Sequence, residues 1–295
     1  MTVLAIDIGG TKIRAGLVDG SATAGVRALP TAPLPGQDSI MPTIIDLVRG
    51  YSGYDAIAVA SAGVISDGRV IAATDLIPNW AGTDIVAELG EAFGVPVTVL
   101  GDVHAHGVGE AAYGAAADYS SSLTVGVGTG IGGAYVSGLV PSVGANGVAG
   151  HIGHITHGAA EGLACSCGRT GHIEALSSGT GMTDAYERVT GMRIGGRELD
   201  ERAEAGESAA QDVLRTGGRA LGEVLGSLAN TLDPAVIVVS GSVSRSTVFW
   251  WPALREGFAS AAMDIVRSTP LVVGELGDDA PLIGAAAFSM KEKHD

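Results

Sequence analysis

Basic residues are scarce in this sequence. Lys and Arg together number 17 against 32 Asp and Glu, which gives a formal net charge of −15. Nucleic acids and anionic membrane surfaces are bound by clustered Lys and Arg, so this balance argues against either as the main partner. A nucleotide needs only a few local donors and a metal ion, and a nucleotide ligand is therefore not excluded.

Cysteine and long apolar runs are also scarce. The two cysteines, Cys165 and Cys167, are one residue apart. This spacing suits a disulfide poorly, so we expect a reducing, cytoplasmic setting in which the thiols bind a metal. The apolar runs have the length of strands and are broken by Gly or Asp, which predicts no membrane span. An apolar run, Val3–Ile8, opens the chain without a basic segment or cleavage site, so we expect no signal peptide.

Glycine, in contrast, is abundant, with 46 residues among 295. It has no collagen-like period, which indicates tight turns and close backbone approaches. The chain length predicts two domains with separate cores. Apolar runs alternate with amphipathic helical patterns, which predicts an α/β fold. The expected strands are residues 3–8, 13–18, 56–60, 95–100, 123–127, 134–136, 236–239 and 271–273, and the expected helices are 40–48, 85–93, 103–113, 209–231, 246–259 and 281–291.

A Gly-rich turn with the sequence DIGGTK joins the first two predicted strands. Because a strand follows the turn, it is neither a P-loop nor a Rossmann fingerprint. Asp7 at the strand end could hold a magnesium shell. An ordinary hairpin with a capping Asp is the alternative. The groups available to a phosphate are the N–H groups of Gly9 and Gly10, the Thr11 hydroxyl and the Lys12 ammonium.

The pattern of strand, Gly-rich turn and strand recurs about 120 residues later, in TVGVGTGIGGAYVSG. A third corner, Gly241 and Ser242, follows a predicted buried strand and suits the close approach of an adenosine. Coincidence between two hairpins is one interpretation. The other is two related domains, each opening with a phosphate-binding hairpin, that face one another across a cleft. The second turn offers Gly128, Thr129, Gly130, Gly132 and Gly133.

The domain boundary is expected near residues 115–120. Residues 1–117 would form an N-terminal α/β domain, onto which the C-terminal helix, about 281–295, packs back. Residues 118–280 would form a C-terminal α/β domain that contains a zinc-binding loop at 150–173.

Asp102 lies between the predicted strand 95–100 and the following helix. As an N-cap it would stabilise that helix by roughly 1 kcal/mol. At the carboxyl end of a strand, where α/β proteins present their ligands, it could instead accept the proton of an attacking hydroxyl. Together with the phosphate-binding turns, this position favours a catalytic base.

The loop 151–172 contains four of the seven histidines and both cysteines. Nitrogen and thiolate ligands in a short loop are typical of tetrahedral zinc. Structural thiols beside surface histidines are the alternative interpretation. The preferred ligand set is His154, Cys165, Cys167 and His172, with His157 as the alternative to His172.

Four motifs, DIGGTK, GTGIGG, GxxGxAGxIGH and CxCGxxGxxE, occur in one order along the chain. In these motifs the sequence resembles, essentially end to end, the ROK family (repressors, open reading frames and sugar kinases). The resemblance implies an actin-like (ribonuclease H-like) ATPase fold, Mg²⁺ with ATP, a hexose or N-acetylhexosamine substrate, structural Zn²⁺ and a homodimer. Family repressors carry an N-terminal helix-turn-helix; this chain begins with the first strand and resembles the kinases.

The resemblance also implies roles for single residues. Asp102 matches the catalytic base. Gly63, His154 and Glu174 match positions that touch the sugar, and His154 also binds the zinc. Asn79 lies in a loop (residues 76–80) that resembles one bordering the sugar.

Three positions depart from the family pattern. Gly101 replaces an Asn that binds the sugar, His172 replaces the third zinc cysteine, and His151 replaces a common Glu. The sequence AGHIGH followed by CxCGRTG resembles the bacterial N-acetylmannosamine kinases. An ionised Glu only accepts hydrogen bonds, whereas neutral His donates one and accepts one, which suits an acetamido sugar.

The implied function is therefore ATP-dependent phosphorylation of the 6-hydroxyl of N-acetylmannosamine, in amino-sugar catabolism. A glucokinase or another hexose kinase of the family is the alternative within enzymes. A sugar sensor without turnover is the alternative from another class. Retention of Asp102 and of both phosphate-binding turns argues against the sensor.

Overall fold

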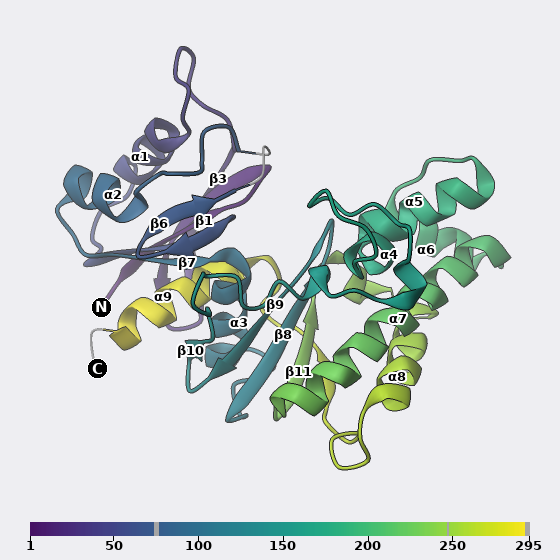
Figure 1. Cartoon of the computed structure of the whole chain (residues 1–295). Helices are drawn as coiled ribbons and strands as arrows, with labels where there is room; N and C mark the ends of the chain where they lie inside the picture. Colours follow the sequence, from purple (N-terminus) through teal and green to yellow (C-terminus); the bar gives the residue numbers. More distant parts are fainter. Residues whose placement is uncertain (74–76, 247, 293–295) are drawn as a thin grey trace. The chain divides into compact units, whose positions relative to one another are not determined.

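The computed structural model describes residues 1–73, 77–246 and 248–292 (Figure 1). The chain divides into two compact units. Unit 1 comprises Met1–Ser121, Ala134–Gly150 and Glu275–Asp295, and unit 2 comprises Ser122–Gly133 and His151–Gly274. Residues 118–121, 134–150 and 275–280 were expected in the C-terminal domain, but they pack with unit 1. Among the described residues, no helix is both long and apolar enough to cross a membrane.

Sheet 1 lies in unit 1 and combines a hairpin with parallel strands. The first two strands are antiparallel, while the first, fourth and seventh strands run parallel to one another. A separate small hairpin pairs the fifth and sixth strands. The order in sheet 1 is β3 (Ala22–Pro30), β2 (Lys12–Asp19), β1 (Val3–Ile8), β4 (Ala56–Ser61) and β7 (Val97–Gly101), and the small hairpin is β5 (Val64–Ser66) with β6 (Arg69–Ala72).

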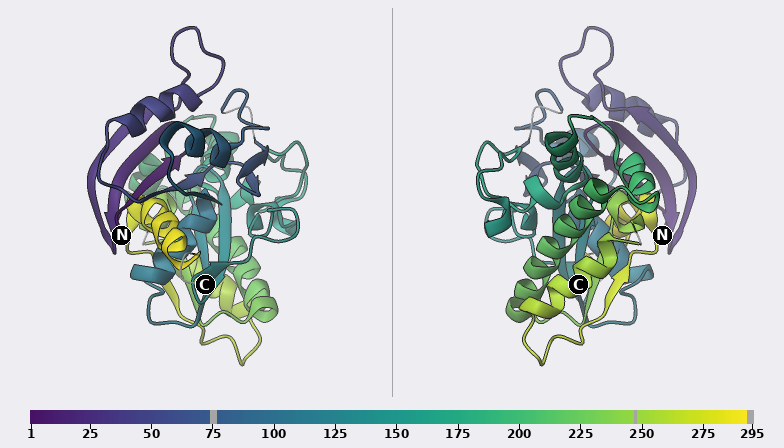
Figure 2. Two further views of the ribbon diagram at one scale, coloured as in Figure 1. Left: turned by 90° about the vertical axis from the view of Figure 1, so that its left-hand side faces the viewer. Right: turned by 90° about the vertical axis from the view of Figure 1, so that its right-hand side faces the viewer.

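Helices cover both faces of sheet 1, because alternate side chains of a strand point to opposite faces. Leu4, Ile6 and Ile8 of β1 pack in a core with α1 (Met41–Arg49) and α2 (Ile85–Phe93). Val3 and Ala5 pack in a second core with α3 (Asp102–Tyr113) and α9 (Ala280–Glu292). Helices α3 and α9 lie side by side although most of unit 2 separates them in the sequence (Figures 1 and 2).

Sheet 2 repeats this arrangement. Its order is β10 (Val140–Pro141), β9 (Ile131–Ser137), β8 (Ser121–Val127), β11 (Val236–Ser240) and β12 (Leu271–Val273). As in sheet 1, a hairpin occupies one side and parallel strands follow on the other. Each strand of sheet 2 thus has a counterpart at the same place in sheet 1. The expected α/β fold with two related halves is confirmed.

The remaining helices belong mainly to unit 2, where the long helix α7 packs against α8. A Cβ on Gly222 of α7 would lie 2.1 Å from the carbonyl oxygen of Leu254 in α8, so this close crossing requires glycine. The helices are η1 (Ile152–His154), η2 (Gly158–Ala160), α4 (Glu174–Ser177), α5 (Gly179–Thr190), α6 (Gly196–Glu204), α7 (Ser208–Leu232), η3 (Ser242–Arg245) and α8 (Trp250–Ala261), with η4 (Gly277–Asp279) in unit 1.

Each predicted strand and helix is present, with boundaries that differ by up to four residues. The helix expected at 246–259 begins at Trp250, because Ser242–Arg245 forms a 3₁₀ turn instead. Two parts of these predictions lie outside the described part of the chain. They are residue 247 of that helix and residues 293–295 of the predicted C-terminal helix. Strands β3, β5, β6 and β10 and helices α4, α5 and α6 were not predicted.

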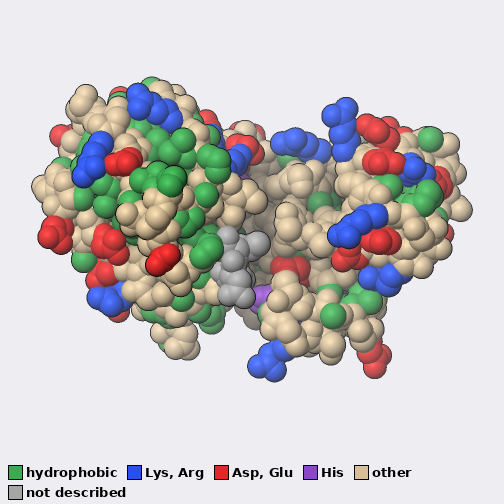
Figure 3. Space-filling model, turned by 90° about the horizontal axis from the view of Figure 1, so that it is seen from above, with side chains coloured by type: hydrophobic (Ala, Val, Ile, Leu, Met, Phe, Trp, Pro, Cys, Tyr) green, Lys and Arg blue, Asp and Glu red, His purple; other side chains and the backbone are tan. Residues whose placement is uncertain are grey.

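Charged side chains are interspersed on the surface. On the face seen in Figure 3, Lys and Arg side chains lie beside Asp and Glu rather than in one basic patch. Helices α6 and α7 show the local reason, since Arg197 pairs with Glu201 at 3.0 Å and Arg219 with Glu223 at 3.2 Å, one turn apart.

Candidate active site

The carboxyl ends of the parallel strands in sheet 1 bring Asp7 and Asp102 to one edge. Asp7 is in register with Ala60 of β4, and Ala60 is in register with Leu100 of β7. Asp102 follows two residues later as the first residue of α3. Its Oδ1 accepts a hydrogen bond from its neighbour Val103 N at 2.8 Å. Gly101, not Asp102, is the N-cap of α3, so the alternative of a capping Asp102 is wrong. Asp102 is close enough for its charge to act on Asp7.

Asp7 has an altered acidity. Its pKa is raised from 3.8 to about 7, mainly by burial and also by the charge of Asp102, while Arg14 and Lys12 act in the opposite direction. Two nearby carboxylates with incomplete compensation by cations form an environment that suits a divalent cation with oxygen ligands.

The first Gly-rich turn is held closed by backbone bonds. Gly9 N donates to Lys12 O at 3.0 Å, and Thr31 Oγ1 donates to Gly9 O at 2.6 Å. Lys12 Nζ pairs with Asp278 at 3.1 Å, and both side chains are exposed. Gly10 and Thr11 complete the turn between β1 and β2. The Lys12 ammonium, which is predicted to bind a phosphate, thus already pairs with the Asp278 carboxylate. A bound phosphate would share this ammonium with Asp278.

Glu110, which the sequence analysis did not single out, fixes the segment that carries Asp278. Its fully buried carboxylate accepts hydrogen bonds from the backbone N–H groups of Ala115, Glu275 and Leu276 at 2.9, 3.1 and 3.0 Å. The sequence did contain a signal for this role, because Glu110 is an acidic residue on the buried face of a predicted helix.

Gly63, which is expected to touch the sugar, has a backbone conformation and a close contact that favour glycine. Its φ is +100°, and an added Cβ would lie 2.8 Å from Ala72 O. Asn79 is exposed, and its Nδ2 donates to Asp38 O at 3.0 Å. Residue 76 of the loop assigned to it lies outside the described residues.

His104 occupies the space beside Gly101, where the family usually has Asn. A Cβ at residue 101 would lie 3.1 Å from His104 Nδ1. The His104 ring is buried, and its Nε2 lies 2.8 Å from Ala149 O. An imidazole from the next helix therefore lies where a side chain at residue 101 would begin.

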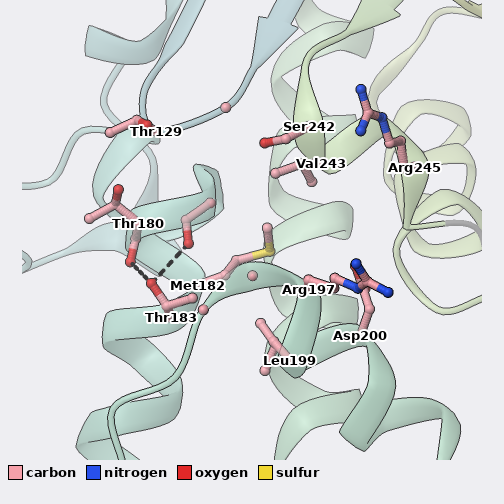
Figure 4. Close-up of a pocket in the computed structure, with 14 residues that line it drawn as sticks. Thr129, Thr180, Met182, Thr183, Arg197, Leu199, Asp200, Ser242, Val243 and Arg245 are labelled. Carbon is pink, nitrogen blue, oxygen red and sulfur yellow. Dashed lines mark hydrogen bonds between the residues drawn. The ribbon is translucent and has the colours of Figure 1, made fainter. Parts of the chain in front are cut away.

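The second Gly-rich turn meets two other segments in unit 2. Gly128 O accepts a hydrogen bond from Gly179 N, at the start of α5, at 2.7 Å. Gly241, with φ +91°, passes so close to β8 that an added Cβ would lie 2.3 Å from Val127 O. These segments line a cavity of about 610 Å³ (Figure 4).

The cavity brings together part of the predicted ATP-binding set. Gly128, Thr129 and Ser242 line it. Gly130 instead packs on Glu174, where an added Cβ would lie 2.7 Å from Oε2, and Gly133 faces Ile152. Gly132 lies within β9. Residues that the sequence analysis missed complete the lining, among them Thr180, Met182, Thr183, Leu199, Asp200 and Arg245.

Glu174 connects the second turn to the cysteine-containing loop. Its Oε2 accepts a hydrogen bond from Ile131 N at 2.9 Å, and its Oε1 accepts one from Ser166 Oγ at 2.7 Å. One carboxylate therefore fixes the turn at the cavity relative to the segment that carries Cys165 and Cys167.

The four predicted metal ligands converge. One ligand atom from each of His154, Cys165, Cys167 and His172 lies within 4.8 Å of the others. His154 Nδ1 is 3.6 Å from Cys165 Sγ, and His172 Nδ1 is 3.3 Å from Cys167 Sγ. Ligand atoms around a tetrahedral zinc lie on the order of 3.5 Å apart, so these separations suit that ion. His157, the alternative ligand, instead places Nε2 3.0 Å from Glu223 Oε2.

His151 lies beside this cluster. Its exposed ring stacks on that of His154, with centroids 6.1 Å apart and an interplanar angle of 25°. The residue that departs from the common Glu is thus adjacent to the histidine expected to touch both sugar and metal.

Comparison with known proteins extends over the whole chain. The ROK family model matches residues 3–292. An N-acetylmannosamine kinase from Shigella flexneri is 33% identical over 308 residues, covering 99% of this chain and 100% of that protein. A ROK hexokinase from Thermus thermophilus is 30% identical with a TM-score of 0.89, and each chain is covered completely. A Streptomyces griseus glucokinase, solved with glucose and AMPPNP, is 27% identical with a TM-score of 0.79, covering 97% of this chain and 98% of that one. The actin-like ATPase fold is confirmed, and the chain belongs to the ROK family.

Proposed function

We propose that the chain is an ATP-dependent kinase that phosphorylates the 6-hydroxyl of N-acetylmannosamine. The observation that carries the kinase proposal is the pairing of Asp102 with the partly buried Asp7 at the carboxyl edge of sheet 1. A sensor that only binds sugar needs neither a base nor a carboxylate suited to magnesium. The full-length likeness to an N-acetylmannosamine kinase supports the choice of sugar.

In this mechanism Asp102 accepts the proton of the attacking sugar hydroxyl. Backbone N–H groups of the two Gly-rich turns and the Lys12 ammonium bind the phosphates. Asp7 would hold the Mg²⁺ of the nucleotide, which supplies charge neutralisation at the transferring phosphoryl group. Positioning and electrostatic stabilisation then account for most of the acceleration.

We assign the cluster of His154, Cys165, Cys167 and His172 to a structural Zn²⁺. Two imidazole nitrogens and two thiolates satisfy the tetrahedral preference of zinc and leave no open position for catalysis. The ion would fix the ring of His154 so that its other nitrogen is oriented toward a sugar.

Replacing one metal ligand tests this assignment. Wild-type protein should contain one zinc per chain, and Cys165→Ser should lower the zinc content and raise the KM for sugar roughly tenfold, because the His154 ring is released. Elemental analysis and steady-state kinetics measure both. His157→Asn is the matched control, since His157 lies in the same loop outside the cluster and should leave zinc unchanged. A metal-free protein with full activity would contradict the assignment.

A sugar panel separates the candidate functions. ADP release is measured with N-acetylmannosamine, N-acetylglucosamine, glucose, mannose and fructose. The highest kcat/KM with glucose would favour the alternative of a glucokinase, which the Streptomyces griseus neighbour supports. Sugar binding without ADP release from any of the five would favour the sensor.

Asp7 predicts a pH-dependent stability. Its pKa is raised from 3.8 to about 7 in the folded chain, so between these values the unfolded chain loses a proton that the folded chain retains. The free energy of unfolding therefore falls by up to roughly 4 kcal/mol as pH rises through this window. Asp7→Asn should be more stable than wild type at pH 8, with little difference near pH 4.

Urea unfolding of both proteins in magnesium-free buffer measures this effect. Asp19→Asn, an exposed aspartate at the end of β2, is the control. A stability difference between Asp7→Asn and wild type that is independent of pH would refute the prediction. Loss of kinase activity in the more stable variant would link the destabilising carboxylate to magnesium.

Two further expectations remain, the first from the spacing of the two cysteines and the second from the family resemblance alone. We propose that the protein is cytoplasmic and forms a homodimer. Light scattering on the eluting protein measures the molar mass of the assembly and decides the second point.

A further inference from the structure

We propose that Asp200 selects the purine base of the phosphoryl donor, by accepting a hydrogen bond from the 6-amino group of adenine. This inference rests on the proposed function, because it concerns the nucleotide of that reaction. It assigns to one side chain of unit 2 the preference for adenine over 6-oxopurines such as hypoxanthine and guanine.

The cavity is polar at both sides and apolar between them. In Figure 4, Thr129 lies on one side, Arg197, Asp200 and Arg245 lie on the other, and Met182 lies between. The phosphate-binding groups are at the Thr129 side, where Gly128 and its turn present backbone N–H groups. A nucleotide carries its phosphates and its base at opposite ends, so the side of Asp200 receives the base.

The middle of the cavity suits the flat faces of a purine. Met182, Leu199 and Val243 line it, and all three are buried. Apolar walls with a few polar groups are the usual form of a small-molecule site. At the far side, Arg197 and Arg245 provide guanidinium groups that can stack on an aromatic ring.

Asp200 is held in place and retains hydrogen-bonding capacity. Its Oδ1 accepts a hydrogen bond from the buried Ser246 Oγ at 2.5 Å. Within the described residues its Oδ2 has no hydrogen-bond partner. The side chain is half-buried on α6, and burial raises its pKa, while the Ser246 hydrogen bond acts in the opposite direction. A fixed acceptor with one available oxygen is what recognition of an amino group requires.

The chemistry of the Asp200 carboxylate favours adenine over its 6-oxo analogue, hypoxanthine. An ionised carboxylate accepts hydrogen bonds and donates none. The 6-amino group of adenine donates, whereas the 6-oxo group of hypoxanthine only accepts. At the 6-position, a 6-oxopurine would place two acceptors in contact and leave both unpaired. This contact disfavours binding of the 6-oxopurine relative to adenine.

The test exchanges the acceptor for a donor. ATP and ITP differ at the 6-position of the base and at N1, which carries a hydrogen only in ITP, and kcat/KM is measured for both with wild type and Asp200→Asn. The amide keeps the shape and the Ser246 contact but can donate to a 6-oxo group. The ATP to ITP ratio of kcat/KM should fall about tenfold or more in the variant. Asp212→Asn, an exposed aspartate on α7 paired with Arg215, should keep the wild-type ratio.

The experiment gives a different result if Asp200 binds the ribose of the nucleotide instead of the base. If Asp200 binds the sugar of the nucleotide, the ratio of ATP to 2′-deoxy-ATP changes and the ATP to ITP ratio does not, which overturns the proposal. An unchanged ATP to ITP ratio overturns it in any case. If wild type turns over no sugar with ATP or ITP, the proposed function fails instead. Calorimetric binding of ADP and IDP to both proteins then decides base selection without turnover.

Discussion

Asp102→Asn is expected to lower turnover by about 10²–10⁴ while the protein remains folded. The amide keeps the shape of the side chain and its contact with Val103 N, which is 2.8 Å from Oδ1. It has no basicity, so the proton of the attacking hydroxyl has no acceptor. The measurement is kcat with N-acetylmannosamine at saturating ATP, together with a thermal melt of both proteins.

Asp84→Asn is the matched control for this variant. Asp84 is the N-cap of α2, where its Oδ1 accepts a hydrogen bond from Ala87 N at 3.0 Å and its Oδ2 pairs with Arg69 at 2.6 Å. If Asp102 had only a structural role at the start of α3, its substitution, like Asp84→Asn, would affect stability and leave kcat unchanged. More than a tenth of wild-type turnover in Asp102→Asn would reject the role of base.

The elements that carry the site were predictable because their signals are local. Strands β1, β4 and β11 are buried on both faces, so they appear in the sequence as apolar runs. β3, in contrast, is an edge strand with mostly exposed residues and no alternation of apolar and polar residues. α6 is polar over most of its length, with only Leu199 and Ala203 buried, and gives a weak helical signal.

The convergence of the four candidate metal ligands was predictable for the same reason. All four lie within 19 residues, so the spacing along the chain already limits how far apart they can be. The meeting of Asp7 with Asp102 followed from a general rule, since parallel strands present their carboxyl ends at one edge.

Contacts between distant segments were not predictable. Lys12 and Asp278 are 266 residues apart in the sequence, and Glu110 and Leu276 are 166 apart. Such pairs depend on the packing of α9 against α3, which no local pattern specifies. The same holds for His104, whose ring fills the space beside Gly101. The cavity lining around Asp200 comes from four separate segments, and two of its helices were not predicted.

His151→Glu is expected to shift the sugar preference toward glucose. Wild type should show its highest kcat/KM with N-acetylmannosamine. A carboxylate at residue 151 cannot donate a hydrogen bond, so an acetamido oxygen would be left unpaired. An unpaired buried polar group costs about 1–3 kcal/mol, which corresponds to a fall of roughly one to two decades in the ratio of kcat/KM for N-acetylmannosamine to that for glucose.

His151→Gln separates hydrogen bonding from packing. A glutamine side chain donates and accepts, as neutral histidine does, so this variant should retain most of the preference for N-acetylmannosamine. The competing view is that His151 only packs against the ring of His154, with which it stacks at 6.1 Å. In that case Glu and Gln would reduce kcat/KM for both sugars by similar factors. An unchanged ratio in His151→Glu would leave the kinase assignment in place, because that depends on Asp102, and would remove the structural reason for naming this sugar.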